Sequence, residues 1–159
     1  MSQEPAPQQT RRVEQLAELI IHSEDDGFDP ELVTQILGLT PASSQRKGER
    51  LRSGRTRDWS AWCWQTPQLV EVDSEVLVRL VLDRFEAVSD RLQDVRSRWD
   101  VTVQVGLVVH CYGTLHSDAD DGVWADVPTP SLSFESGTVR RLVALDASLD
   151  IDEYISVPE

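Results

Sequence analysis

The sequence predicts an α+β fold in which a duplicated strand-helix-strand unit forms a ferredoxin-like, mainly antiparallel four-stranded sheet, with helices on one face and an extra connecting helix. Two matches predict the duplication: residues 18–22 (ELIIH) are similar to residues 106–110 (GLVVH), and residues 28–39 (FDPELVTQILGL) are similar to residues 134–145 (FESGTVRRLVAL). Apolar residues at helical spacing between the two copies predict the extra helix.

The first copy contains a strand, a turn and a helix. Residues 13–22 have the period-2 character of a strand, with an apolar run over residues 19–21, although Leu16 and Ala17 also fit a helical start. Asp29 is a good N-cap, Pro30 suits the first helical position, and Gly38 ends the apolar stripe. We therefore predict a helix that begins at Pro30 and ends before Gly38.

Residues 43–57 lack apolar periodicity and predict an exposed, mobile loop. This loop is basic, and its cations are Arg46, Lys47, Arg50, Arg52, Arg55 and Arg57. Residues 59–66 then predict a strand from their aromatic content, with Trp62 and Trp64 on one face and Trp59 on the other.

The second half repeats the strand and the helix around an insertion. Residues 73–98 predict one long helix or two helices broken near residues 89–90, and residues 101–112 alternate as a strand. A helix over residues 136–145 and a closing strand over residues 149–155 follow.

The two matches differ in offset, 88 residues from Leu19 to Leu107 and 106 residues from Phe28 to Phe134, which places an insertion of 18 residues within 116–130. The insertion is acidic and contains Asp118, Asp120, Asp121 and Asp126. Its spacing differs from that of a calcium-binding EF-hand loop, because glycine occupies the position of a third oxygen ligand. We expect this loop to be exposed, with no metal site and no cofactor.

Composition limits the classes of function. A chain of 159 residues is long enough for one substantial core, so we expect a single domain over residues 13–157 after a disordered tail, residues 1–12. The chain has no signal-peptide pattern and no apolar run of the roughly 18 residues that span a membrane. Cys63 and Cys111 match no zinc or redox motif, so we expect buried, reduced thiols. These features predict a cytoplasmic protein that does not bind membranes.

The formal net charge of −13 argues against nucleic-acid binding, because phosphates would be repelled, and favours a basic protein partner. The sequence carries no signal for an oligomeric state.

If the repeat holds, each strand has one buried and one open face. The expected buried residues are Leu19, Ile21, Leu107, Val109, Cys111, Leu149 and Ile151. The expected open face carries Asp150 and one set of tryptophans beside histidines and tyrosines. The candidate binding residues are His22, His110, Tyr112, Asp152, Tyr154, Trp59, Trp62 and Trp64. A plainer interpretation is that these side chains only solvate the sheet, and that the tryptophans belong to the core.

Several short motifs resemble the bacterial domain-of-unknown-function family 4279 over about residues 15–155. They are Phe28, residues 37–41 (LGLTP), residues 47–49 (KGE), Trp59 with Trp62, then Leu142, Leu145 and residues 149–154 (LDIDEY). The resemblance implies no activity and no catalytic residue, and the acidic insertion departs from the pattern.

Three functions therefore compete. A non-enzymatic protein-binding module, such as an immunity protein or antitoxin, agrees with the small size, the acidity and the lack of a catalytic motif. A small-ligand-binding regulatory or sensor domain would use the open face of the sheet. An enzyme would use His22, His110 and Asp152 for proton transfer. The sequence predicts the first, with no catalytic residue.

Overall fold

The computed structural model describes residues 11–118 and 122–157, which form an α+β domain. The elements in chain order are β1 (Arg12–Ser23), α1 (Pro30–Leu37), β2 (Ser43–Gln45), β3 (Ser60–Gln65), β4 (Leu69–Val70), α2 (Ser74–Glu86), α3 (Ser89–Arg98), β5 (Thr102–Tyr112), β6 (Thr114–Asp118), β7 (Gly122–Asp126), α4 (Ser136–Ala144) and β8 (Ala147–Ser156).

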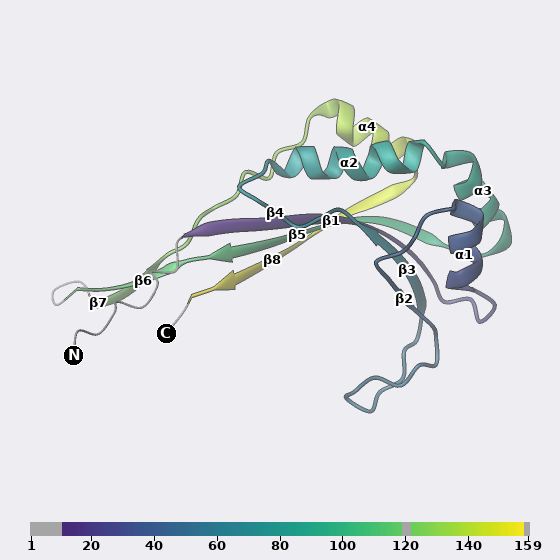
Figure 1. The fold of residues 1–159 in the computed structure, drawn as a ribbon, viewed down its shortest axis with the longest axis horizontal. Helices are drawn as coiled ribbons and strands as arrows, with labels where there is room; N and C mark the ends of the chain where they lie inside the picture. The colour runs from purple at the N-terminus through teal and green to yellow at the C-terminus, as the bar shows by residue number, and fades with distance from the viewer. Residues whose placement is uncertain (1–10, 119–121, 158–159) are drawn as a thin grey trace.

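A mixed sheet organises the fold, with β1 and β5 at its centre. The strand order is β2-β3-β1-β5-β8, and the short β4 also pairs with β1. β1 is antiparallel to β3, β4 and β5, whereas β8 is parallel to β5. Figure 1 shows α2 and α4 side by side over one face of the long strands, with α1 and α3 at one end of the sheet. The hairpin β6–β7 extends beyond the opposite end.

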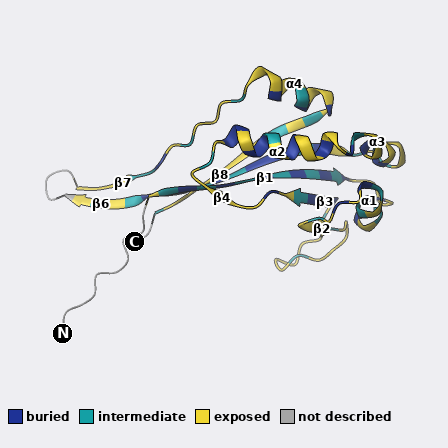
Figure 2. Ribbon diagram, turned by 45° about the horizontal axis from the view of Figure 1, so that its top comes forward, coloured by how far each residue is buried: buried dark blue, intermediate teal, exposed yellow. Residues whose placement is uncertain are grey.

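The core lies between this sheet and the helices. Every second residue of β1 from Val13 to Ser23 is buried, as expected for a strand covered on one face. Leu77, Val81 and Phe85 of α2 are fully buried against it. In Figure 2, β1 is buried or intermediate along its length, while the outer end of the β6–β7 hairpin is exposed.

Helix ends follow the predicted local signals. Asp29 caps α1 by accepting the N–H of Glu31, and Gly38 ends the helix with a φ of 65°. Asp73 caps α2 by accepting the N–H of Glu75. Of the two predictions for residues 73–98, two helices are correct: the backbone leaves the helical region at Val88, whose side chain is buried.

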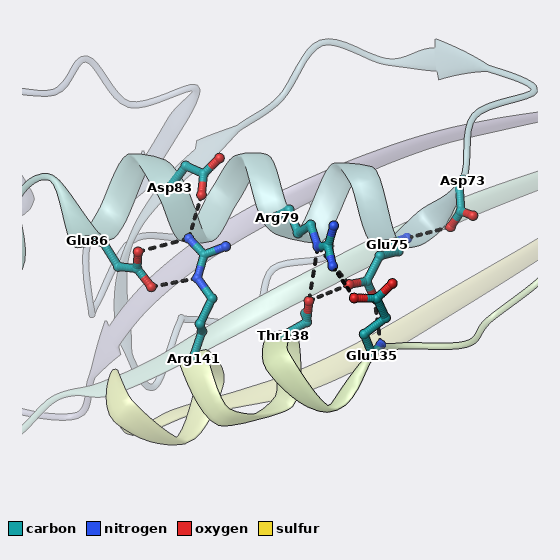
Figure 3. A network of polar contacts seen from close by, with 8 residues as sticks. All are labelled: Asp73, Glu75, Arg79, Asp83, Glu86, Glu135, Thr138 and Arg141. Atoms are coloured by element: carbon teal, nitrogen blue, oxygen red, sulfur yellow. Dashed lines mark hydrogen bonds and ion pairs between the residues drawn. The ribbon is translucent and has the colours of Figure 1, made fainter.

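Ion pairs and hydrogen bonds join α2 to α4 (Figure 3). Glu75 is only 8% exposed, and its carboxylate accepts hydrogen bonds from the Thr138 hydroxyl and from the backbone N–H of Glu135. Arg79 also pairs with Glu75, at 2.8 Å. These contacts fix the start of α4 over α2.

Further along the same pair of helices, Arg141 of α4 reaches both Asp83 and Glu86 of α2. The guanidinium thus holds the second half of α4 to α2, and these two carboxylates raise the pKa of Arg141.

The predicted ferredoxin-like, four-stranded sheet is wrong. Over residues 11–118 and 122–157, the main sheet has six strands and a second sheet has two. β1 and β5 lie side by side, with Glu18 paired to Gly106, and each is later followed by a helix. The predicted strand-helix-strand unit is not repeated as a whole, because β3 returns antiparallel to β1 whereas α4 carries the chain back so that β8 runs parallel to β5.

Two predicted loops contain regular structure. In the basic segment, β2 pairs with β3, and residues 48–57 continue as a hairpin through backbone hydrogen bonds such as Gly48 N–H to Arg57 O. The acidic insertion forms β6 and β7, although residues 119–121, including Asp120 and Asp121, lie outside the described residues. Neither segment has an apolar pattern. Backbone hydrogen bonds pair these strands, and in the β6–β7 hairpin His116 also stacks on Trp124, with ring centroids 4.3 Å apart.

The predicted tail lies largely outside the described residues, which begin at Arg11. Arg12, which the sequence assigned to the tail, is the first residue of β1. No helix in the described part of the chain has the length and apolar character needed to cross a membrane.

Candidate binding face

The face of the sheet opposite the helices is the candidate binding surface, called here the open face. Residues of even number from the three long strands share it, because side chains alternate along paired strands. They are Arg12, Glu14, Leu16, Glu18, Ile20 and His22 of β1, Thr102, Gln104, Gly106, Val108, His110 and Tyr112 of β5, and Ser148, Asp150, Asp152, Tyr154 and Ser156 of β8.

Three of the predicted residues form an aromatic cluster at one end of this face. His110 pairs with Tyr154 across β5 and β8, and their rings stack with centroids 5.0 Å apart and planes 17° apart. The His110 ring also stacks with that of Tyr112, two residues along β5, with centroids 6.5 Å apart and planes 21° apart. Tyr154 is 51% exposed, so the cluster presents an accessible ring.

Arg12 and Glu14 of β1 border the aromatic cluster. The Arg12 guanidinium lies 4.2 Å from the centroid of the Tyr112 ring and donates to Glu14 at 2.7 Å. This arrangement already shows the chemistry that the open face offers, because one cation is held by a carboxylate and an aromatic ring together.

Carboxylates fill the middle of the open face. Glu18 pairs with Gly106, which pairs in turn with Asp150, and Asp152 is two residues further along β8. Gly106 has no side chain, and a Cβ there would lie 3.7 Å from the Glu18 carboxylate. Burial raises the pKa of Glu18, and the charge of Asp152 raises it further.

Neither cysteine is placed for nucleophilic chemistry. Both are free and buried. Burial, followed by the negative charge of Glu18, raises the pKa of Cys63 to about 12, and burial and Glu153 also raise the pKa of Cys111. Both side chains are therefore neutral thiols at physiological pH.

His22 lies on the open face but far from the aromatic cluster. It pairs with Thr102, whereas His110 pairs with Glu14, eight residues along the same ladder. At the rise of a β-strand the separation is about 27 Å. His22 instead packs against Trp59, with ring centroids 6.1 Å apart. The structure thus does not bring His22 together with His110 and Asp152.

The three candidate tryptophans are separated by the sheet. Trp59 is 40% exposed beside His22, on the open side. Trp62 is fully buried on the helix side, where its indole N–H donates to Thr34. Trp64 lies on the helix side too, packed at the margin of the core. The prediction of Trp62 as a binding residue is wrong, because its side chain belongs to the core.

Sequence reasoning missed four residues whose side chains make the polar contacts described on the open face: Arg12, Glu14, Glu18 and Gln104. The first three lie at even positions of β1, as His22 does. The same period-2 argument that selected His22 would have found Glu14 and Glu18, whereas Arg12 precedes the strand predicted over residues 13–22. Gln104 donates to Asp150 across β5 and β8 at 2.9 Å, a contact that depends on the parallel pairing of these strands.

Cavities lie elsewhere on the molecule. One of about 780 Å³ lies at the start of β1, between the β4–α2 connection and residues 128–131. Its lining contains none of the predicted site residues. Among the described residues, no group of three or more His, Cys, Asp or Glu side chains is arranged to hold a metal ion.

Comparison with known proteins adds a family. The model of a family described as a domain of unknown function (DUF4279) matches residues 11–156. No curated protein and no solved structure matches the chain.

Proposed function

Because the chain belongs to the DUF4279 family, whose description names no activity, we propose its function from the surface itself: it is a protein-binding module that takes up a basic protein on the open face. The alternative is a regulatory domain that binds a small ligand on the same face.

One observation carries this proposal. Asp150 and Asp152 of β8, called here the acidic edge, take part in none of the ion pairs among the described residues. Both are exposed. Exposed carboxylates without a cation are free to accept Lys or Arg side chains of a partner.

Aromatic rings beside the acidic edge support the same partner chemistry. Tyr154 follows the acidic edge on β8 and is half exposed next to His110. Arginine side chains stack on such rings while a neighbouring carboxylate holds their charge, as Arg12 does within this protein. A partner rich in arginine would therefore find both contacts together.

Among the described residues, seven of the 15 cationic side chains pair with acids of this chain. Arg79 and Arg141 bind carboxylates of the α2–α4 network, and Arg46 and Lys47 bind Asp29 and Asp26. The net charge of −13 thus supports long-range attraction of a basic partner. An immunity protein or antitoxin is the class that we propose, because such a protein acts by occupying a basic toxin.

The small-ligand alternative is supported by the stack of His110 on Tyr154. The two rings are nearly parallel, with centroids 5.0 Å apart, and the half-exposed Tyr154 ring offers a surface on which a planar molecule can stack. The protein partner is preferred because Tyr154 adjoins the exposed acidic edge, and because the cavity described above contains neither His110 nor Tyr154 in its lining.

The direct test is capture of partners from an extract of the native host, with the purified protein as bait at low and high salt. We expect a basic protein to be retained at low salt and released as the salt rises above about 0.15 M, where the Debye length is about 8 Å. A bait with Asp150→Asn and Asp152→Asn should retain much less of it.

The matched control bait carries Asp83→Asn, which removes a carboxylate from the helix side. It should capture the partner as well as the wild type does. Recovery of no protein at either salt, together with saturable heat release on addition of a host metabolite extract, would favour the small-ligand function instead.

A further inference from the structure

The sheet ends on one side in a long strand whose outer edge is open. β8 spans Ala147–Ser156, and within the described residues it pairs with β5 alone. The other edge strand, β2, covers three residues. Residues 150–156 are all exposed, so this edge is accessible to another strand.

Backbone geometry shows which groups of β8 face outward. The carbonyl of Ser156 accepts the N–H of Gly113, so it points toward β5. Backbone groups alternate along a strand, and therefore those of Ile151, Glu153 and Ile155 point to the open edge. The N–H of Ile151 agrees with this direction, since it is bonded to the side chain of Asp150 and not to β5.

Side chains along β8 offer contacts on both of its faces. Tyr154 lies on the open face beside the acidic edge, and it is 51% exposed. On the helix side α4 covers only the beginning of the strand, so Ile151 remains 36% and Ile155 61% exposed. A strand placed along β8 would cover apolar surface on the helix side and meet carboxylates on the open face.

We propose that β8 binds its partner by strand addition, and that the occupant is an extended, basic segment in which Arg or Lys alternates with apolar residues. This inference rests on the proposed function and specifies how the partner binds. Asp150 and Asp152, two residues apart on one face, select cations at alternate positions of the added strand. Ile151 and Ile155 select apolar residues between those cations.

Charge decides between this occupant and a second copy of the chain. Pairing of β8 with β8 of another copy would place Asp150 and Asp152 near the same residues of that copy. Like charges across a strand pair are destabilising, and each copy has a net charge of −13. The carboxylates that keep β8 from self-association are the groups that attract a basic strand.

The test uses the whole protein and a synthetic peptide of about eight residues that alternates arginine and valine. The control peptide has the same composition with all valines before all arginines. We expect the alternating peptide to bind at least about tenfold more tightly than the control. In amide hydrogen exchange of the wild type, the N–H groups of Glu153 and Ile155 should become protected when it binds.

Two variants separate backbone pairing from charge. Glu153→Pro removes an outward N–H without removing a bond to β5, so the variant should fold and lose at least about tenfold in affinity for the alternating peptide. Glu153→Gln should lose less than about threefold. Circular dichroism and the melting temperature verify the fold of both.

Equal binding of the two peptides, an unchanged affinity of Glu153→Pro, no binding of the alternating peptide at millimolar concentration, or a dimer of the free protein in sedimentation would each overturn strand addition. Capture experiments distinguish a failure of strand addition from a failure of the proposed function. If Glu153→Pro retains the basic host protein as well as the wild type does, the function stands and strand addition fails.

Discussion

The carboxylate of Glu75 in α2 accepts the backbone N–H of Glu135 at 3.1 Å, and so caps the N-terminus of α4 from outside that helix. α4 has no side-chain cap of its own at this position. The position of α4 thus depends on Glu75, a buried residue of another helix. Because α4 leads directly into β8, the path of the chain into β8 depends on Glu75 too.

Glu75→Gln should lower the free energy of unfolding by about 1–3 kcal/mol, because it removes a buried charge that accepts hydrogen bonds from Thr138 and Glu135. Chemical denaturation measures this change. The control is Glu86→Gln on the same helix, whose exposed pair with Arg141 is expected to contribute no more than about 1 kcal/mol. Equal effects of the two variants would contradict the capping role.

The contribution of Glu75 should depend on pH. Burial alone would raise the pKa of Glu75, but the hydrogen bonds from Thr138 and from the N–H of Glu135, with the charge of Arg79, lower it overall. A carboxyl whose pKa is lower in the folded state stabilises the protein above its unfolded pKa, and this stability is lost as the pH falls through the folded pKa. The difference in unfolding free energy between wild type and Glu75→Gln should therefore shrink from about pH 7 to about pH 3. A difference that stays constant over that range would show that ionisation of Glu75 contributes nothing.

Trp62→Ala should lower the free energy of unfolding by about 3–5 kcal/mol, since it removes a fully buried ring and its bond to Thr34. Trp59→Ala should change it by less than about 1 kcal/mol, because that ring is 40% exposed. Urea titrations followed by far-UV circular dichroism compare the two. Similar losses would mean that Trp59 also supports the core.

Gly113→Ala should strain the passage from β5 into β6. A Cβ at Gly113 would lie 2.9 Å from the backbone oxygen of Asp126 and 2.9 Å from Cγ2 of Val127, so one of the two segments must move. We expect a loss of about 1–3 kcal/mol. The matched control is Gly137→Ala in α4, where nothing lies within 4 Å of the new Cβ; it should be neutral or stabilising by up to about 1 kcal/mol. A neutral Gly113→Ala would indicate that the β6–β7 hairpin shifts freely.

Local patterns in the sequence were sufficient to predict most of the helices and strands. The alternation of apolar residues correctly predicted β1 and β5, and Asp29, Pro30 and Gly38 correctly bounded α1. These features depend on a residue and its near neighbours, because strand alternation and helix capping are short-range effects. The polar character of the open face followed from the same alternation.

Contacts between segments that are distant in the sequence decided the features of the fold that local patterns did not predict. The backbone pairing that forms β2 and the β6–β7 hairpin leaves no apolar pattern, so the sequence predicted loops there. The sequence also could not separate Trp62 in the core from Trp59 at the surface, because both lie in one aromatic strand segment and only the helices determine which face is covered. In the same way, the alternation in residues 149–155 determined that Asp152 and Tyr154 share a face. The tertiary structure alone placed Tyr154 against His110 and left the outer edge of β8 open, because the direction of a strand depends on where the preceding helix crosses the sheet.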